Sequence, residues 1–359
     1  MTTWRQAWFW VAAFVAFILF LLVFSEILLP FVAGMVLAYA LDPVADRIER
    51  LGFGRLAATL SILVVLVVVL ALAFVLLVPI LADQLADFIE RIPSYVERLR
   101  ALFSSLLQSR LSDYFGIDLT KIGSSLGGLT SQGTSWMATL LASLWSGGQT
   151  ILNILALLIV TPVVAFYLLY DWDRLVARVD SWLPRDHVEE VRKIARDIDR
   201  AIAAFIRGQG LVCLILAVVY STGLVIVGLN FGFLIGLGAG LLSFIPFVGA
   251  TVGFVVSLGV AIAQFWPDWI WILATVAVFG VGQFLENYVL QPRLIGQNVG
   301  LHPVWVMFSL FAFGYLFGFV GVMIAIPAAA AVGVLVRYAL GRYLDSPIYR
   351  GRGGKPLKK

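Results

Sequence analysis

The sequence predicts an all-α, polytopic membrane protein with about seven to eight helical segments, two of them broken or re-entrant hairpins, joined by amphipathic helices. Apolar residues make up 61% of the chain and charged residues only 13%, whereas soluble domains contain about 25% charged residues. Several apolar runs are long enough to cross a bilayer, which takes about 20 residues. The charges are also segregated along the chain, so membrane and water-facing parts can be told apart.

The charged residues gather in four stretches: 42–55, 83–121, 171–207 and 337–359. Four others stand scattered among the apolar runs: Glu26, Asp268, Glu286 and Arg293. An ionised side chain is costly in hydrocarbon unless it is paired, protonated or beside water. Each scattered charge therefore needs either an interfacial position or a polar partner.

Five apolar runs suit simple spanning helices: 7–24, 57–80, 148–170, 208–229 and 269–290. The first run follows Arg5 as in a signal peptide, but no small-residue cleavage site follows it, so we expect a retained helix. Segment 27–41 is short and is joined to the first run by Ser25, Glu26 and Pro30. We expect the two to form a hairpin.

The distribution of basic residues predicts which loops face the cytoplasm. Arg47, Arg50 and Arg55 crowd one loop, and a run of Arg and Lys crowds 171–207. Cytoplasmic loops of membrane proteins carry such an excess. We therefore expect both loops and both termini in the cytoplasm, with 81–147 outside.

Two connecting segments, 83–107 and 188–205, carry apolar residues at helical spacing along one face. Either segment could rest on its own protein or on lipid headgroups, or could bind a partner helix. Resting on the protein or on headgroups is the commoner outcome for such helices.

The last third contains two similar broken segments. Residues 231–264 are interrupted by Pro246 and Gly249, and 303–337 contain Gly318 and Gly321 in the middle. Breaks of this kind free backbone groups that only protein or a polar cavity can satisfy. Each segment could enter the membrane and turn back, the first from outside and the second from the cytoplasm. This inverted arrangement is the one in which transporters place a binding site at mid-membrane.

Polar residues mark the end of the run between these segments. Gln283, Glu286 and Asn287 fall at three- and four-residue steps and share one helix face, and Pro292 and Arg293 follow. Glu286 is a functional candidate, because a carboxylate within bilayer reach is expensive. The alternative is that Glu286 pairs with Arg293 near the interface and only braces the turn.

Several motifs, weak singly but specific together, carry a resemblance along nearly the whole length: "LAYALDPVADRIER", "VPILADQLADFIERIPSYVERL", "TPVVAFYLLYDWDR", "IPFVGA", "ENYVLQPRLIGQNVGLHPVWV" and "LFGFVGVMIAIPAAA". The chain resembles the autoinducer-2 exporter family, the PerM-like permeases. Asp42 stands where the family usually has Asn before Pro43. That substitution leaves the expected helix-ending role of Pro43 intact and puts any amide-specific contact in doubt.

The resemblance implies a transporter that exports a small polar signal molecule or exchanges cations for protons, assembled as a homo-oligomer, with a pentamer possible. The substrate or ion pathway would then involve the polar cluster and the breaks, that is, Gln283, Glu286, Asn287, Arg293, Pro246, Gly249, Gly318 and Gly321. The organisation predicted is N-terminal membrane helices (1–80), an extracytoplasmic region (81–147), a membrane and a cytoplasmic helix (148–207), a transport core (208–340) and a basic tail (341–359).

The sequence does not favour an enzyme or a nucleic-acid-binding protein. No Gly-x-x-x-x-Gly-Lys-Ser/Thr loop is present, so ATP hydrolysis by this chain is not expected. His187 and His302 lack the neighbours of a metal site or a nucleophile–base pair, and Cys213 lies in an apolar run. We expect no enzyme activity, no cofactor or metal, and no nucleic-acid partner, because the basic excess lies in a tail suited to the anionic bilayer surface. An oligomeric channel and a membrane scaffold remain as alternatives.

Overall fold

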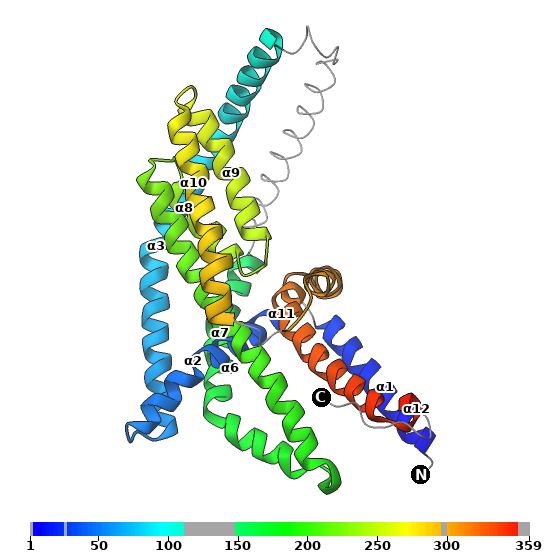
Figure 1. Cartoon of the computed structure of the whole chain (residues 1–359). Helices are drawn as coiled ribbons and strands as arrows, with labels where there is room; N and C mark the ends of the chain where they lie inside the picture. The colour runs from blue at the N-terminus through cyan, green and yellow to red at the C-terminus, as the bar shows by residue number, and fades with distance from the viewer. Residues whose placement is uncertain (1–2, 25–26, 111–147, 296–299, 351–359) are drawn as a thin grey trace. The chain divides into compact units, whose positions relative to one another are not determined.

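The structure is a computed structural model that describes residues 3–24, 27–110, 148–295 and 300–350 (Figure 1). Within these ranges every regular element is helical, which confirms the all-α prediction. Seven helices of the described chain are long and apolar enough to cross a membrane by length and composition. The protein is therefore a multi-pass membrane protein.

The chain forms two compact units that interleave along the sequence. The first contains residues 1–65, 156–210 and 292–359, and the second contains 66–155 and 211–291. Several long helices therefore begin in one unit and end in the other. Because of this division, the contacts of each unit are described separately.

In the first unit, α2 (Leu28–Arg50) packs closely on α6 (Gly148–Ser181). A Cβ at Gly34 would come within 2.7 Å of the Val164 side chain, so the two helices can approach this closely because Gly34 has no side chain. The hydroxyl of Thr161 also donates to the carbonyl of Pro30 at 3.2 Å. The first unit is completed by α1 (Thr3–Val23), the short η2 (Arg185–His187), α11 (Pro303–Asp345) and α12 (Pro347–Arg350), with the ends of longer helices.

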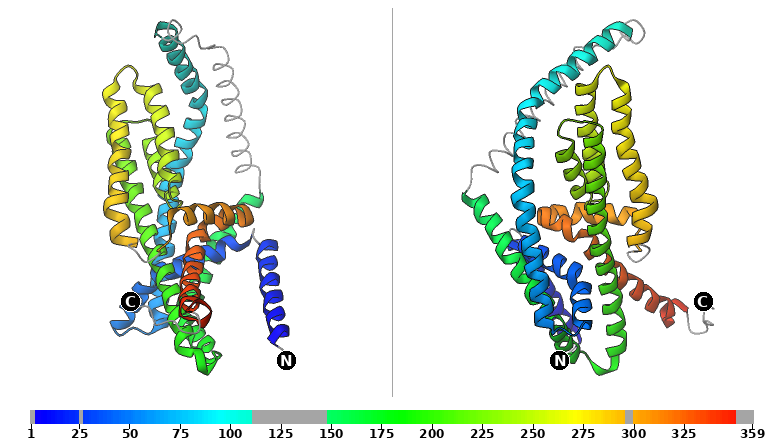
Figure 2. Two further views of the ribbon diagram at one scale, coloured as in Figure 1. Left: turned by 45° about the vertical axis from the view of Figure 1, so that its right-hand side comes forward. Right: turned by 90° about the vertical axis from the view of Figure 1, so that its left-hand side faces the viewer.

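In the second unit, α8 (Gly232–Leu242) lies directly against α7 (Val188–Ile226). A Cβ at Gly236 or Gly240 would overlap the backbone of Ser221 or Ala217, so the four-residue glycine spacing permits backbone contact. Helices α9 (Val248–Phe265) and α10 (Trp269–Phe284) run side by side with α8 in both views of Figure 2. The glycines of α8 thus allow close packing of α8 on α7.

Both predicted breaks occur in the structure, in different forms. Between α8 and α9 a short turn makes a helical hairpin, and Phe247 has a φ of 68°. Within α11 the helix breaks at Gly318, where φ is 59° and ψ is −138°. The orange and red parts of α11 accordingly meet at an angle in Figure 2. A φ in this range strains any residue that carries a Cβ, which explains glycine at position 318.

Some helices are longer than the sequence indicated. The run 57–80 and the amphipathic segment after it form one helix, α3 (Arg55–Arg110), and α7 likewise joins 188–205 to 208–229. Helix α2 also continues to Arg50, so Pro43 does not end it. An internal proline removes one hydrogen bond and crowds a carbonyl, but a helix can continue where the freed group finds another donor. The Gly/Ser-rich part of 81–147 and the last nine residues of the basic tail fall outside the described residues.

Candidate functional site

The Glu286 carboxylate is buried in the second unit, near the end of a long apolar helix. Helix α10 continues as the π-helix η3 (Leu285–Ile295), and Glu286 lies in its first turn with only 6% of its surface exposed. The carboxylate accepts hydrogen bonds from the Gln283 amide at 2.8 Å and from the Gln291 amide at 3.4 Å. Both partners are neutral, and within the described part of the second unit no cation forms an ion pair with Glu286.

The π-helical geometry explains why these two glutamines meet one carboxylate. Gln283 precedes Glu286 by three residues, as on an α-helix, but Gln291 follows by five, which suits the wider π turn. Pro292 lies inside this turn and cannot donate a backbone hydrogen bond. Turns of this kind occur often at functional sites.

Tyr220 of α7 extends the polar cluster. Its hydroxyl accepts from Gln283 at 3.4 Å, and its ring is fully buried and stacked on Phe279 with centroids 4.6 Å apart. A Cβ at Gly282 would overlap this ring. Gly282 therefore lets Tyr220 approach Gln283, which in turn positions Glu286.

Replacing Gly282 with alanine should lower stability by about 1–2 kcal/mol, because the buried Tyr220 ring must move to admit a methyl group. The midpoint of thermal unfolding of the purified protein measures the loss. Gly280→Ala is the matched control, since nothing lies within 4 Å of a Cβ built there. Equal midpoints for the two variants would contradict this packing role.

The other predicted site residues lie around these groups or elsewhere in the fold. Asn287 is exposed, with its amide nitrogen 3.5 Å from the Gln283 oxygen. Gly249 lies at the start of α9, where a Cβ would overlap the backbone of Ser243, one turn after Pro246. Arg293, Gly318 and Gly321 belong to the first unit. Their participation in a pathway stays a prediction.

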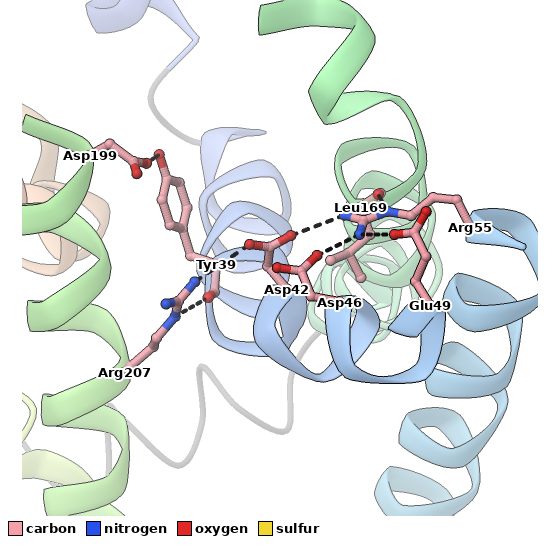
Figure 3. A network of polar contacts seen from close by, with 8 residues as sticks. All are labelled: Tyr39, Asp42, Asp46, Glu49, Arg55, Leu169, Asp199 and Arg207. Carbon is pink, nitrogen blue, oxygen red and sulfur yellow. Dashed lines mark hydrogen bonds and ion pairs between the residues drawn. The ribbon is translucent and has the colours of Figure 1, made fainter. Parts of the chain in front are cut away.

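A second polar network occupies the first unit and was not predicted from the sequence (Figure 3). Asp42, Asp46 and Glu49 lie on one face of α2, and all three bind the guanidinium of Arg55 at 3.0, 2.8 and 3.3 Å. Arg55 also donates from Nε to the carbonyl of Leu169 on α6 at 2.9 Å. One arginine thus joins the start of α3 to α2 and α6.

The same network reaches α7 through a second arginine. Arg207 donates from Nε to the carbonyl of Tyr39 at 2.8 Å and lies 3.6 Å from Asp42. The Tyr39 carbonyl is the one that Pro43, four residues later, cannot bond, so Arg207 supplies the missing donor. The Tyr39 hydroxyl donates to Asp199 at 3.1 Å.

A pocket of about 70 Å³ opens among these groups, between α2, α6 and α7. Asp42, Asp199 and Arg207 give it charge, and Tyr39 and Trp172 give it an aromatic wall. A space of this size holds only a few water molecules. The spacing of the three acids at positions 42, 46 and 49, followed by Arg55, was the available sequence signal. The positive-inside rule instead predicts a loop position for that arginine.

Neither centre resembles a metal or nucleophile site. Across the ranges that the structure covers, no group of three or more His, Cys, Asp or Glu side chains is arranged to hold a metal ion. What the buried carboxylate can do is exchange a proton or hold a small cation, because its two amide partners leave its charge uncompensated. Both of these uses belong to membrane transport.

Comparison with known proteins supports the same class. The sequence model described as "AI-2E family transporter" matches residues 11–341. The putative transport protein YrrI of Bacillus subtilis is 28% identical over 324 residues, which cover 89% of each chain. The putative permease PerM of Escherichia coli K12 is 30% identical over 316 residues, covering 87% of each. The AI-2 transport protein TqsA of the same strain is 24% identical over 330 residues, or 88% of this chain and 87% of TqsA.

The family match at residues 11–341 spans every motif quoted above. With the seven candidate membrane helices, these matches make the protein a membrane transporter or permease. The chain belongs to the AI-2E transporter family.

Proposed function

We propose that this chain is a secondary transporter that exports a small polar solute, with Glu286 on the pathway and a proton or cation as the coupling ion. The observation that carries the proposal is the burial of the Glu286 carboxylate between two neutral amides in an apolar helix. A charge held in this way lowers the stability of the fold, so its presence favours a functional role. Intramembrane carboxylates commonly serve as proton or ion relays.

The substrate class is inferred from the relatives. TqsA is named as an AI-2 transport protein, so autoinducer-2 stands first in the panel of solutes to test. Exchange of a cation for a proton is the other form that the buried carboxylate supports. In either case Gln283 and Gln291 would set the geometry in which Glu286 meets the solute or ion.

The deciding experiment is flux in proteoliposomes over a panel of autoinducer-2, other small polar solutes, Na⁺ and K⁺, with and without an imposed pH or Na⁺ gradient. A carrier should saturate and respond to a gradient. Flux that neither saturates nor responds to a gradient would favour an oligomeric channel. Absence of flux for every solute, from protein that is folded, would favour a scaffold.

We also propose a homo-oligomer in the bacterial inner membrane, with a pentamer as the first assembly to test and with both termini and 171–207 in the cytoplasm. The ion pair between Arg342 and Glu190, at 2.8 Å, supports one shared side for 171–207 and the C-terminal segment.

A cysteine introduced by Ser181→Cys is not expected to be labelled from outside intact cells. Labelling of this cysteine from outside would contradict the proposed orientation of 171–207. Native mass spectrometry in several mild detergents tests the assembly, and monomer alone in all of them would contradict it.

A further inference from the structure

A charged pocket of about 520 Å³ lies between α7 and α11 in the first unit, apart from both polar centres. Its lining is mostly ionisable, and its apolar members are Ile194, Ala201 and Val334. The ionisable and polar members are Glu190, Lys193, Asp197, Arg200, Arg337 and Tyr338. No step of the proposed transport uses them.

On α11 the pocket lies where charged and apolar sequence meet. On α11, Arg337 is the first charged residue after Pro303, and Val334 lies one turn before it. On α7 the lining residues come from the charged, amphipathic part of the helix before Arg207, a part that the sequence predicts to rest on the protein or on lipid headgroups. The boundary on α11 is of the kind expected at the depth of the lipid headgroups. A pocket beside such a boundary is expected at the surface of the bilayer.

The carboxylates of the pocket are already paired, and two of the cations are not. Glu190 binds Arg342 at 2.8 Å, and Asp197 binds Arg200 at 3.4 Å. Lys193 has no carboxylate within ion-pair distance among the described residues, and Arg337 donates only to the Gly300 carbonyl at 3.4 Å. With Arg342 included, the pocket and its immediate ion pairs contain four cationic side chains and two carboxylates. The pocket has room for an anion and a charge excess to bind it.

We propose that this pocket binds the phosphate group of an anionic phospholipid. The guanidinium of Arg337 and the ammonium of Lys193 are donors suited to phosphate oxygens. The apolar lining side chains of Val334 and Ile194 suit the glycerol and first acyl carbons of a lipid better than a free phosphate ion. A zwitterionic headgroup would bring its own ammonium toward these cations, so the site should favour phosphatidylglycerol over phosphatidylcholine. Basic pockets between membrane helices bind anionic headgroups in this way.

Lipid retention by the full-length protein tests the proposal. Detergent-solubilised protein is incubated with equal amounts of phosphatidylglycerol and phosphatidylcholine, and native mass spectrometry counts the lipids kept by each chain. The expected result is retention of phosphatidylglycerol over phosphatidylcholine by about tenfold, which corresponds to about 1.4 kcal/mol. Lys193→Gln/Arg337→Gln should abolish the preference.

Arg47→Gln/Arg50→Gln is the matched control, since it removes the same charge from exposed positions of α2 outside the pocket. It should keep the preference. Equal loss in both variants, or no loss in either, would overturn the site. A third arm adds glycerol 1-phosphate: displacement of the lipid at equimolar concentration would show a soluble phosphate site and overturn the lipid assignment. Thermal unfolding in phosphatidylcholine alone confirms that each variant is folded.

Discussion

Replacing Glu286 with glutamine is expected to abolish the response of transport to a pH gradient while leaving the protein folded. The amide has nearly the shape of the carboxylate but cannot release a proton. One of the amides of Gln283 and Gln291 can turn to accept from the new amide nitrogen while the other still donates to the remaining oxygen, so both hydrogen bonds of residue 286 survive the change. Coupled flux should fall by about 100-fold or more, the usual effect of removing a group that transfers protons.

The stability of the same variant distinguishes the two interpretations of Glu286. If the carboxylate is a buried charge with only amide partners, its removal should leave the unfolding midpoint unchanged or raise it. If Glu286 instead braces Arg293, glutamine should lower the midpoint and leave coupled flux largely intact. The double variant Glu286→Gln/Arg293→Gln completes the comparison, because a brace would make the second change nearly neutral after the first.

Asp268→Asn is the matched control for charge. Asp268 is an exposed carboxylate just before the first turn of α10, and its side chain makes no capping bond. Coupled flux in this variant should match that of the wild-type protein. Normal coupled flux in a stable Glu286→Gln protein would remove Glu286 from the mechanism.

Positions of the helix breaks could be predicted from the sequence because the residues there have restricted or unusual backbones. Gly318 adopts a positive φ that other residues avoid, and the glycines of α8 allow the backbone of α7 to approach. What could not be predicted was the form of each break. A proline and glycine in an apolar run are compatible with a hairpin, as between α8 and α9, or with a kink, as in α11.

Helix ends were predicted less well, because a proline has consequences that depend on distant partners. Pro43 was expected to end a helix, but α2 continues for another two turns. The carbonyl that Pro43 leaves without a donor is satisfied by Arg207, 168 residues away from Tyr39 along the chain. No local pattern in the sequence indicates such a donor.

Only part of the candidate site could be predicted from the sequence. Helical spacing placed Gln283 and Asn287 near Glu286, and the structure has both on the same end of the helix. Gln291 was missed because the five-residue step belongs to a π turn, and α-helical periodicity places that residue on another face. Tyr220 was missed because it comes from a different helix.

The Arg55 network was missed for a related reason. Arginines beside a membrane helix are usually explained by sidedness, and the positive-inside rule accounted for Arg55 without any partner. The structure buries the Arg55 side chain to 14% exposure and surrounds it with acceptors from two helices. Arg55, which the positive-inside rule treats only as a loop charge, therefore joins α2, α3 and α6.

Replacing Arg55 with methionine should destabilise the first unit more than any other single change considered above. Methionine keeps much of the packing volume and removes four hydrogen bonds, those to Asp42, Asp46, Glu49 and Leu169. Three carboxylates at three- and four-residue spacing on α2 would then repel one another. Removing one partner of a buried ion pair costs about 3–5 kcal/mol. Because these carboxylates are 33–48% exposed, we expect about 2–3 kcal/mol.

The comparison of three variants identifies the cause of that loss. Arg55→Lys keeps the charge but offers a single ammonium in place of a planar fork, so it should recover only part of the stability. Arg47→Met removes an exposed arginine from the same end of α2, and its midpoint should stay within about 0.5 kcal/mol of wild type. In the double variant Arg55→Met/Asp46→Asn, one of the repelling charges is gone, so the combined loss should be smaller than the sum of the single losses. Strict additivity, or an Arg55→Met protein as stable as Arg47→Met, would show that the guanidinium does not hold α2, α3 and α6 together.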